Sequence, residues 1–542
     1  MKDHDPHALH CQASDHDKRI QISMARLVGR CMWRRSSVGW RWILLAVCAP
    51  ASAHGFGLRY DLPLPLLLWI IGAASTVLLS FFFVAIFVRW NPGTEAPAEV
   101  NLLRWKTGRV ISGLAFRFIA RLFAVGALIV IVVAGMFGDQ TPTRNLAPTA
   151  IWIAWWVGFS YLSAFVGNIW CVINPWAALF EWYEESFSIQ SARRGARIGW
   201  PKTLGVWPAT GLFIAFAWIE LVWDGRSIPS RLAWLAIGFS AITWMGMLLF
   251  GRNTWLRYGD PFALAFSVLA RFAPTEMRVA TCVVDPRARA TNGGVSTIDR
   301  GEPVDCDCYY RAAESKRRWI LRPPGAGLLH TKNVTPSLVV FVIVMLSTVT
   351  FDGLMATPLW QRIENGLYEG LPILGDSRLT IINTLGLLSF CTIFIAVYRV
   401  VATLVANASQ KSMTVDTASR AFVLTLVPIA IAYLVAHYSS YFLIQGQLLI
   451  RLASDPFGFG WNIFGSAHFR PDIGIVGARF VLYTSLFAIV LGHVVAICLA
   501  HIIALRNVDD PRAALRSQIP MLMLMVAYTM MSLWIIAQPI VE

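Results

Sequence analysis

The stretch SLVVFVIVMLSTVTFDGLMATP, residues 337–358, is apolar along almost its whole length and carries one charged residue, Asp352. A helix needs about 20 predominantly apolar residues to cross a lipid bilayer, and this stretch meets that requirement. Comparable stretches occur at residues 64–88, 110–137, 149–173, 203–223, 230–250, 378–402, 418–441, 475–504 and 519–538. The sequence therefore predicts an all-α fold, a polytopic membrane helical bundle with about ten transmembrane helices.

The composition is that of a membrane protein and not of an ordinary soluble one. Of the 542 residues, 56% are hydrophobic and 14% are charged, whereas soluble domains carry about 25% charged residues. The net charge of +15 could indicate nucleic-acid binding, which requires a basic patch on a folded face. Membrane topology explains the charge better, so no nucleic-acid partner is expected. The nine cysteines show no even framework on one side, and no disulfide scaffold is predicted.

Residues 1–53 have the features of a leader with a signal peptide. Three arginines precede a short apolar run, which is followed by the small-residue motif ASA ending at Ala53. Met24 is a possible true start, because the residues before it are polar. Cleavage after Ala53 would make His54 the first residue of the mature chain; the alternative is an uncleaved interfacial anchor.

The distribution of Lys and Arg predicts the orientation of the bundle. If the mature N-terminus is exported, one set of connections holds 27 Lys/Arg against 16 Asp/Glu, and the other set holds nine of each. Cytoplasmic loops carry an excess of Lys and Arg, so the basic set is expected in the cytoplasm. That set comprises residues 89–109, 174–202, 251–335, 399–420 and 505–518. The prediction is a multi-pass protein of the bacterial inner membrane with both mature termini in the periplasm.

The expected mature chain has three parts: spans one to five in residues 54–275, a cytoplasmic loop at 276–335, and spans six to ten in 336–542. The loop contains the sequence VDCDCYY. Three Cys and one His in this loop offer the ligand types of a zinc site, and the alternative is a reduced, solvated loop. These four residues are Cys282, Cys306, Cys308 and His330.

Two short segments of the basic connections, NPWAALF (174–180) and DPFALAF (260–266), share an Asx-Pro-aromatic start. Each is typical of an N-capped helix with proline at its first position. Both helices are expected to lie along the membrane surface with their aromatic residues at the headgroup level. Arg117 and Arg121, one helical turn apart near the inner end of the second span, are expected to extend to lipid phosphates.

Polar residues gather in the outer half of the predicted bundle, where charged side chains are costly and often functional. Asp352 lies near the end of its span, and His437 begins a stretch that reads as a re-entrant or lid segment. We predict catalytic roles for Asp352, His437 and Asp455, substrate binding by Gln445, Gln447 and Trp461, and metal binding by His54 and His468. A divalent metal is the possible cofactor. The alternative is structural: interhelical hydrogen bonds, with Asp352 paired to an arginine such as Arg451.

Several strings distributed along the chain carry a resemblance: AHGFGLRYDLPLP, GNIWCVINPW, TFDGLMATPLW, LIQGQLLIRLASDPFGFGWNIFG and RSQIPMLMLMVAYTMMSLWIIAQPI. Together they resemble bacterial integral membrane proteins of the fenitrothion hydrolase family. The resemblance implies hydrolysis of a small apolar organophosphorus triester with release of a nitrophenol. It supplies no catalytic residues to carry over, and the sequence has no H-x-H, H-x-x-x-D or HExxH motif.

Three alternatives to a hydrolase follow from the same residues. A transporter would be expected to show paired halves with broken helices, and a metal-handling protein would use His54 with a second histidine. A haem protein would need histidines at equal depth on two helices. His493 and His501 lie on one predicted span, about 12 Å apart, and cannot share one metal.

Overall fold

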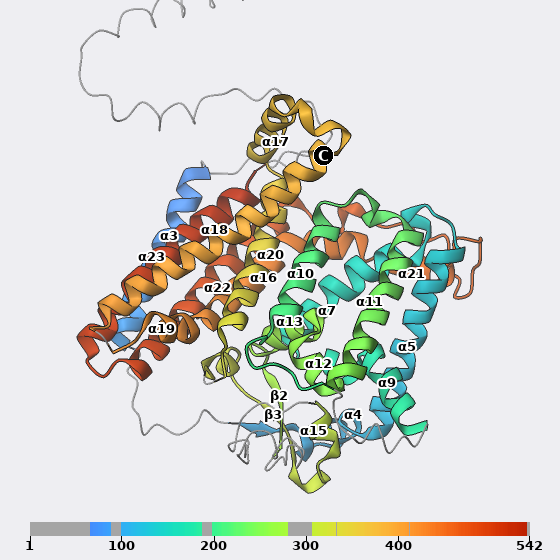
Figure 1. The fold of residues 1–542 in the computed structure, drawn as a ribbon, viewed down its shortest axis with the longest axis horizontal. Helices are drawn as coiled ribbons and strands as arrows, with labels where there is room; N and C mark the ends of the chain where they lie inside the picture. The colour runs from blue at the N-terminus through green and yellow to red at the C-terminus, as the bar shows by residue number, and fades with distance from the viewer. Residues whose placement is uncertain are drawn as a thin grey trace, which may run out of the picture. The chain divides into compact units, whose positions relative to one another are not determined.

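The computed structural model describes residues 66–87, 99–186, 198–279, 306–331, 333–410 and 412–538, and most of these residues are helical (Figure 1). All of them belong to one compact unit, Tyr60–Glu542. The predicted leader, its cleavage site and His54 lie outside the described residues. The prediction of an all-α, polytopic helical bundle is confirmed.

Eight helical segments of the described chain are long and apolar enough to cross a membrane. Their core helices are α3 (Leu66–Phe87), α5 (Leu114–Phe137), α11 (Pro229–Phe250), α16 (Pro336–Met355), α18 (Arg378–Ala408), α20 (Val427–Gln445), α22 (Ala478–Asn507) and α23 (Pro511–Ile536). The apolar helix α20 is extended at its start by α19 (Val415–Phe422) and a 3-10 turn, Val423–Leu426. These helices indicate a lipid bilayer environment.

The number of predicted spans, about ten, is higher than the eight found among the described residues. The third expected span is a continuous helical run over residues 146–165, made of α6 (Leu146–Pro148), a π-helix (Thr149–Val157) and α7 (Gly158–Phe165). It has the roughly 20 residues that cross a bilayer, but it is not one regular α-helix. The fourth is α10 (Trp207–Leu221), which has 15 residues and is shorter than that length.

The helices α16 and α20 form the centre of the bundle. In the span windows that contain them, 78% and 89% of the residues are buried, against 22% for α5. Helices that are apolar on all faces belong either in a core or against lipid, and burial distinguishes the two cases here. The central pair carries Asp352 and His437, so the charged residues of these spans lie between helices and not against lipid.

The two helices with Asx-Pro starts form as predicted, but their aromatic residues lie elsewhere. Asn174 caps α9 (Pro175–Ser186) through Ala177 N at 3.1 Å, and Asp260 caps α13 (Pro261–Ala270) through Phe262 N at 2.9 Å. Their aromatic residues are buried in the main core: Trp176 is 6% exposed and Phe262 is 4% exposed. The expectation that their aromatic residues lie at the headgroup level is therefore wrong, because these residues pack against the spans; that the helices lie along the membrane surface stays a prediction.

A small three-stranded antiparallel sheet lies at one end of the bundle, which we name the sheet face. It contains β1 (Val100–Asn101), β3 (Arg317–Leu321) and β2 (Thr275–Val279), in that order, and α15 (Cys306–Arg311) packs beside it. Figure 1 shows the sheet and α15 below the helices, at the opposite end from α17 (Pro358–Gly370). The described parts of 276–335 are thus folded and do not form a solvated loop.

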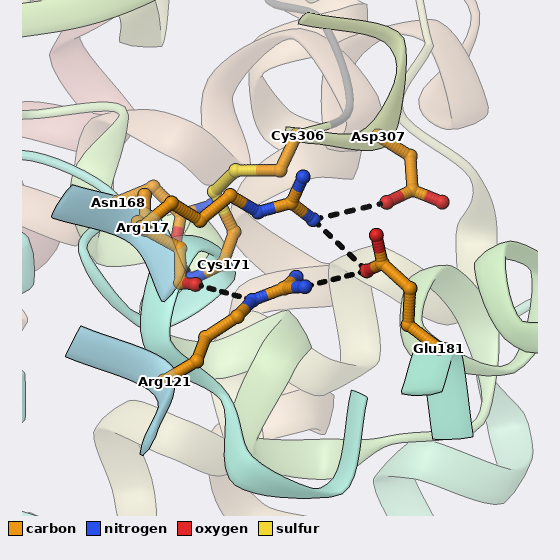
Figure 2. The surroundings of a disulfide bond; sticks show 8 residues. Arg117, Arg121, Asn168, Cys171, Glu181, Cys306 and Asp307 are labelled. Atoms are coloured by element: carbon orange, nitrogen blue, oxygen red, sulfur yellow. Dashed lines mark hydrogen bonds and ion pairs between the residues drawn. A yellow bond between two sulfur atoms is a disulfide. The ribbon is translucent and has the colours of Figure 1, made fainter. Parts of the chain in front are cut away.

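A disulfide joins Cys171, at the end of the third expected span, to Cys306 in α15 (Figure 2). This finding corrects the expectation of a reduced cysteine-containing loop, and it adds one disulfide to a chain for which no disulfide scaffold was predicted. Cys306 is buried, and the bond uses its sulfur. Cys282, the third cysteine of the considered zinc site, lies outside the described residues.

Candidate functional site

Asp352 and His437 contact each other between the two central helices. The Nε2 atom of His437, on α20, lies 2.8 Å from Oδ2 of Asp352, on α16. The hydroxyl of Tyr438 donates to the same carboxylate oxygen at 2.6 Å. Sequence reasoning selected Asp352 and His437 separately, and the structure brings them together. The alternative pairing of Asp352 with an arginine such as Arg451 is not what the structure shows.

Aromatic rings fix the imidazole of His437. Tyr433 stacks on it with ring centroids 6.0 Å apart, and Tyr438 meets it edge-on at 4.7 Å. Tyr433 precedes His437 by four residues and so shares its helix face. Gly353 makes this arrangement possible, since a Cβ atom there would meet the Tyr433 hydroxyl at 2.1 Å. Sequence reasoning missed both tyrosines. The spacing of four residues between Tyr433 and His437 could have indicated Tyr433, whereas no sequence pattern indicated Tyr438.

A small cavity borders Asp352 and is not lined by His437. Its free volume is about 10 Å³, room for about one water molecule, and Asp352 and Glu220 contribute carboxylates from α16 and α10. Tyr438 and the aromatic rings of Trp156, Phe213 and Phe216 complete most of its wall. Two carboxylates and a phenol around an apolar space are suited to holding and moving a proton. We name Glu220, Asp352, His437 and Tyr438 the carboxylate site.

The backbone around Glu220 is held by Arg226. Its guanidinium Nη1 donates to the carbonyl of Glu220 at 3.2 Å and to that of Leu221 at 2.7 Å. These bonds satisfy carbonyl groups that a helix leaves without partners at its C-terminus. Glu220 is thereby placed at the last turn of α10, with the cavity beside it.

Two of the other predicted residues have structural contacts. The carboxylate of Asp455 accepts from Phe459 N at 3.0 Å and from Gly460 N at 2.8 Å, which closes a turn. Gln447 exchanges hydrogen bonds with the backbone of Asp472 at 3.0 Å in both directions. The predicted catalytic role of Asp455 and the substrate-binding role of Gln447 remain untested.

The remaining predicted residues lie apart from any such contact. Gln445 ends α20, and Trp461 is 44% exposed and packs against Phe457 and Phe459. His468 is exposed. Only part of the predicted lid is helical: after α20, α21 (Leu448–Ser454) is followed by turns and by one short 3-10 helix, Ile473–Ile475.

A metal site formed by three or more His, Cys, Asp or Glu side chains is absent from the described part of the chain. His54, which was predicted as a ligand together with His468, is outside that part. The divalent metal therefore stays a prediction, because one of its two predicted ligands, His54, has no described position.

An ionic cluster that sequence reasoning missed lies at the sheet face (Figure 2). Glu181, on α9, accepts from Arg117 at 3.0 Å and from Arg121 at 2.5 Å, and lies 2.8 Å from Nη1 of Arg252. Asp307 of α15 binds Arg252 at 2.5 Å. Arg117 and Arg121 are only 6% and 5% exposed. The prediction that these two arginines extend to lipid phosphates is therefore wrong. Carboxylates of the protein neutralise them instead.

The environment of this cluster shifts the ionisation of its acids in opposite directions. Burial alone would raise the pKa of Glu181, but Arg252, Arg121 and Arg117 together hold this pKa below its ordinary value. Burial raises the pKa of Glu184, which lies 3.7 Å from Arg252, above its ordinary value. Glu181 is therefore the ionised centre of the cluster, and removing its charge would leave three buried guanidinium groups poorly compensated.

Comparisons with known proteins identify no relative. No family model matches the chain, and neither a curated protein nor a solved structure is significantly similar to it. The class that the fold and the site define is a polytopic helical membrane protein with a histidine–carboxylate pair between its central helices.

Proposed function

We propose that the protein is an integral membrane hydrolase of small apolar organophosphorus triesters, with the carboxylate site as its active site. The observation that carries the proposal is the His437–Asp352 contact beside a cavity bordered by a second carboxylate. A histidine oriented by a carboxylate is a common general base. The resemblance to fenitrothion hydrolases supplies the substrate class.

In the proposed reaction, His437 takes a proton from water as the water oxygen attacks phosphorus. The Nε2 atom of His437 faces Asp352 at 2.8 Å, which leaves Nδ1 to accept that proton. The new P–O bond forms as the bond to the aryl oxygen breaks, and nitrophenolate leaves with the electron pair. Asp352 stabilises the imidazolium that results, and Tyr438 holds the carboxylate in place through its 2.6 Å hydrogen bond.

The size of the cavity places a condition on this proposal. Its free volume of about 10 Å³ is far below the roughly 300–1,000 Å³ of most small-molecule sites. The proposal therefore requires α10, α16 or the π-helix to move apart when substrate enters. An apolar aryl ester partitions into lipid, so entry from the bilayer is the expected route.

We propose the orientation in which the sheet face is cytoplasmic and the mature termini are periplasmic, in a bacterial inner membrane. The excess of Lys and Arg in the connections of that face supports this orientation. The Cys171–Cys306 disulfide argues against this orientation, because disulfides form and persist mainly in oxidising compartments and the cytoplasm is reducing. Under the proposed orientation, the bond must be protected by burial against cytoplasmic reductants.

Labelling of single cysteines in intact cells tests the orientation. A cysteine introduced at Glu314, exposed on the sheet face, is expected to resist a membrane-impermeant maleimide until the cells are opened. A cysteine at Ile373, which is 90% exposed at the other end, is expected to react in cells whose outer membrane alone is permeable. The reverse pattern would invert the orientation and place the carboxylate site near the cytoplasm.

A proton-coupled transporter is the second candidate, because two carboxylates line a cavity next to an irregular helix. Trp156 of the π-helix borders that cavity, and interrupted helices are frequent at the binding sites of transporters. Such a protein would move protons across proteoliposome membranes in a way that depends on Glu220 and Asp352, and it would release no nitrophenol.

The hydrolase proposal is tested with purified protein and fenitrothion, with and without a chelator. Nitrophenol release is expected from the wild type and is expected to be lost in His437→Ala. Tyr398→Phe, which changes a buried residue outside the carboxylate site, serves as the control. Folded wild-type protein that releases no nitrophenol under either condition would rule out this activity. Loss of release with chelator alone would show that a metal takes part.

A further inference from the structure

Three ring side chains from three helices meet in the interior of the bundle, beyond the carboxylate site. Tyr433 of α20 lies 6.5 Å from Tyr528 of α23, and Tyr528 lies 5.9 Å from His493 of α22, as measured between ring centroids. Tyr433 and His493 are each 1% exposed, and Tyr528 is 8% exposed. We name these three residues the inner triad.

The hydrogen bonding of His493 fixes its tautomer. Its Nδ1 atom lies 2.7 Å from the backbone carbonyl of Ile489. A carbonyl oxygen only accepts, so Nδ1 carries the hydrogen and Nε2 of the neutral ring is left as an acceptor. Within the described residues, no donor lies within hydrogen-bond distance of this buried Nε2 atom.

The hydroxyl of Tyr433 lacks an acceptor for its hydrogen. It is buried, and no hydrogen-bond partner for it exists among the described residues. Tyr528 lies between the two groups, and its own hydroxyl contacts Thr350 Oγ1 at 2.6 Å. A buried polar group left without a partner costs about 1–3 kcal/mol, and native proteins usually satisfy such groups with ordered water. The Tyr433 hydroxyl can donate and His493 Nε2 can accept, and the two groups lie on either side of Tyr528. A water molecule can satisfy both, because it accepts as well as donates hydrogen bonds.

A haem or a bulky ligand does not fit the same place. Helices α20 and α22 touch at Gly492, where a Cβ atom would meet Ala432 at 2.5 Å and the carbonyl oxygen of Pro428 at 2.8 Å. This close contact lies next to His493 in the sequence and leaves no width for a macrocycle on that side. The ligand class that the triad can take is therefore one or a few water molecules.

We propose that bound water joins Tyr433, Tyr528 and His493 and extends the Asp352–His437 pair into a proton relay that ends at His493. Tyr433 connects the two groups because its ring lies beside that of His437, with centroids 6.0 Å apart; the proton itself moves through water and not through the stacked rings. In the relay, a proton leaving His437 passes through water and the Tyr433 hydroxyl to water at His493 Nε2, so that each group gives up one proton as it accepts another. The water site stands on geometry alone, whereas the relay role rests on the proposed hydrolase function.

Hydroxyl-radical footprinting of the intact protein in detergent tests the water site, since radicals formed from internal water label the side chains beside it. We expect Tyr433 and Tyr528 to be labelled at least threefold more than Tyr398. Tyr398 is the matched control, because it is 3% exposed and its hydroxyl donates to Ser419 O at 2.8 Å. Equal labelling of all three tyrosines would overturn the proposal.

Two variants separate the water site from the relay. His493→Leu removes the acceptor and is expected to reduce the labelling of Tyr433 and Tyr528 to the level of Tyr398, with an unchanged elution profile as the test of folding. Tyr433→Phe is expected to alter the solvent deuterium isotope effect on nitrophenol release by at least 1.5-fold, whereas Tyr398→Phe leaves it unchanged. Identical isotope effects in the two variants would overturn the relay. Failure of the hydrolase proposal leaves the footprinting result valid by itself.

Discussion

Asp352 is the one charged residue of the apolar stretch 337–358, and both His437 and Tyr438 contact its carboxylate. These contacts give the carboxylate the hydrogen-bond partners that a charge between helices requires. The spacing of 85 residues between Asp352 and His437 carries no pairing information, so their contact could not be predicted from one sequence. Glu181 was missed for the same reason, since its three arginine partners come from two distant helices.

Tyr438 is predicted to position the carboxylate of Asp352. Tyr438→Phe removes one hydrogen bond to a charged acceptor, an interaction of about 1.5–3 kcal/mol, so nitrophenol release is expected to fall about tenfold or more. The KM for fenitrothion should change little, because the hydroxyl contacts Asp352 and not the substrate. Steady-state kinetics measures both quantities. Tyr398→Phe is the control, and an equal fall in that variant would argue against a specific role of Tyr438.

Glu181 is predicted to make the protein sensitive to acid. Its pKa in the folded protein lies below the ordinary 4.5, so its stabilisation is complete above that pH and is lost as the pH falls through the folded value. Thermal unfolding followed by fluorescence should show a lower midpoint in Glu181→Gln at neutral pH, by the equivalent of about 3 kcal/mol. The gap in midpoint to the wild type should narrow as the pH falls below 4.5 and Glu181 becomes protonated in the wild type. Glu314→Gln, at an exposed site, should match the wild type throughout.

Among the helices, hydropathy predicted eight spans that the structure contains, but neither the winding of the third expected span nor the length of the fourth. The third passes from α6 through a π-helix into α7, and the fourth, α10, stops after 15 residues. Apolar composition reports that a segment is helical and buried, but not how regularly it is wound or where it stops. The burial of α13 could not be predicted either. A short apolar helix can lie at the surface or in the core, and its sequence alone does not say which segments pack around it.

The contact between α20 and α22 is predicted to depend on Gly492. A methyl group there would meet Ala432 and the backbone of Pro428 at less than 3 Å, and overpacking of this kind costs about 1–3 kcal/mol. Gly492→Ala should therefore lower the thermal midpoint by several degrees. Gly238→Ala, in α11, adds the same group where no atom lies within 4 Å and should not lower it. Equal midpoints for the two variants would contradict the close packing.

At the scale of the whole molecule, the sheet face and the carboxylate site are held together by different means. The sheet face combines a disulfide with an ionic cluster, whereas the carboxylate site has one histidine–carboxylate pair, aromatic rings and a small cavity. The overall architecture could be predicted because apolar length reports directly on the bilayer. The folded sheet face could not, because its strands come from three separated segments of 2–5 residues.

The disulfide is predicted to stabilise the bundle, since it joins residues 135 positions apart. Closing a loop of this size restricts the unfolded chain by about 4–5 kcal/mol in the entropic model. Cys171→Ala with Cys306→Ala should lower the thermal midpoint, and non-reducing peptide mapping of the wild type should recover the two cysteines in one linked product. Complete alkylation of both cysteines without reductant would show that the bond is absent from the purified protein.

The central claim is that the His437–Asp352 pair activates water for ester hydrolysis, and the single-turnover rate of nitrophenol release by Asp352→Asn tests it most directly. The substitution keeps the size of the side chain and removes the charge that orients and stabilises the imidazolium. At equal amounts of folded protein, we predict a fall of about 100-fold or more, which is the usual contribution of a positioned general base. A rate within about twofold of the wild type would contradict the assignment of this pair as the active centre.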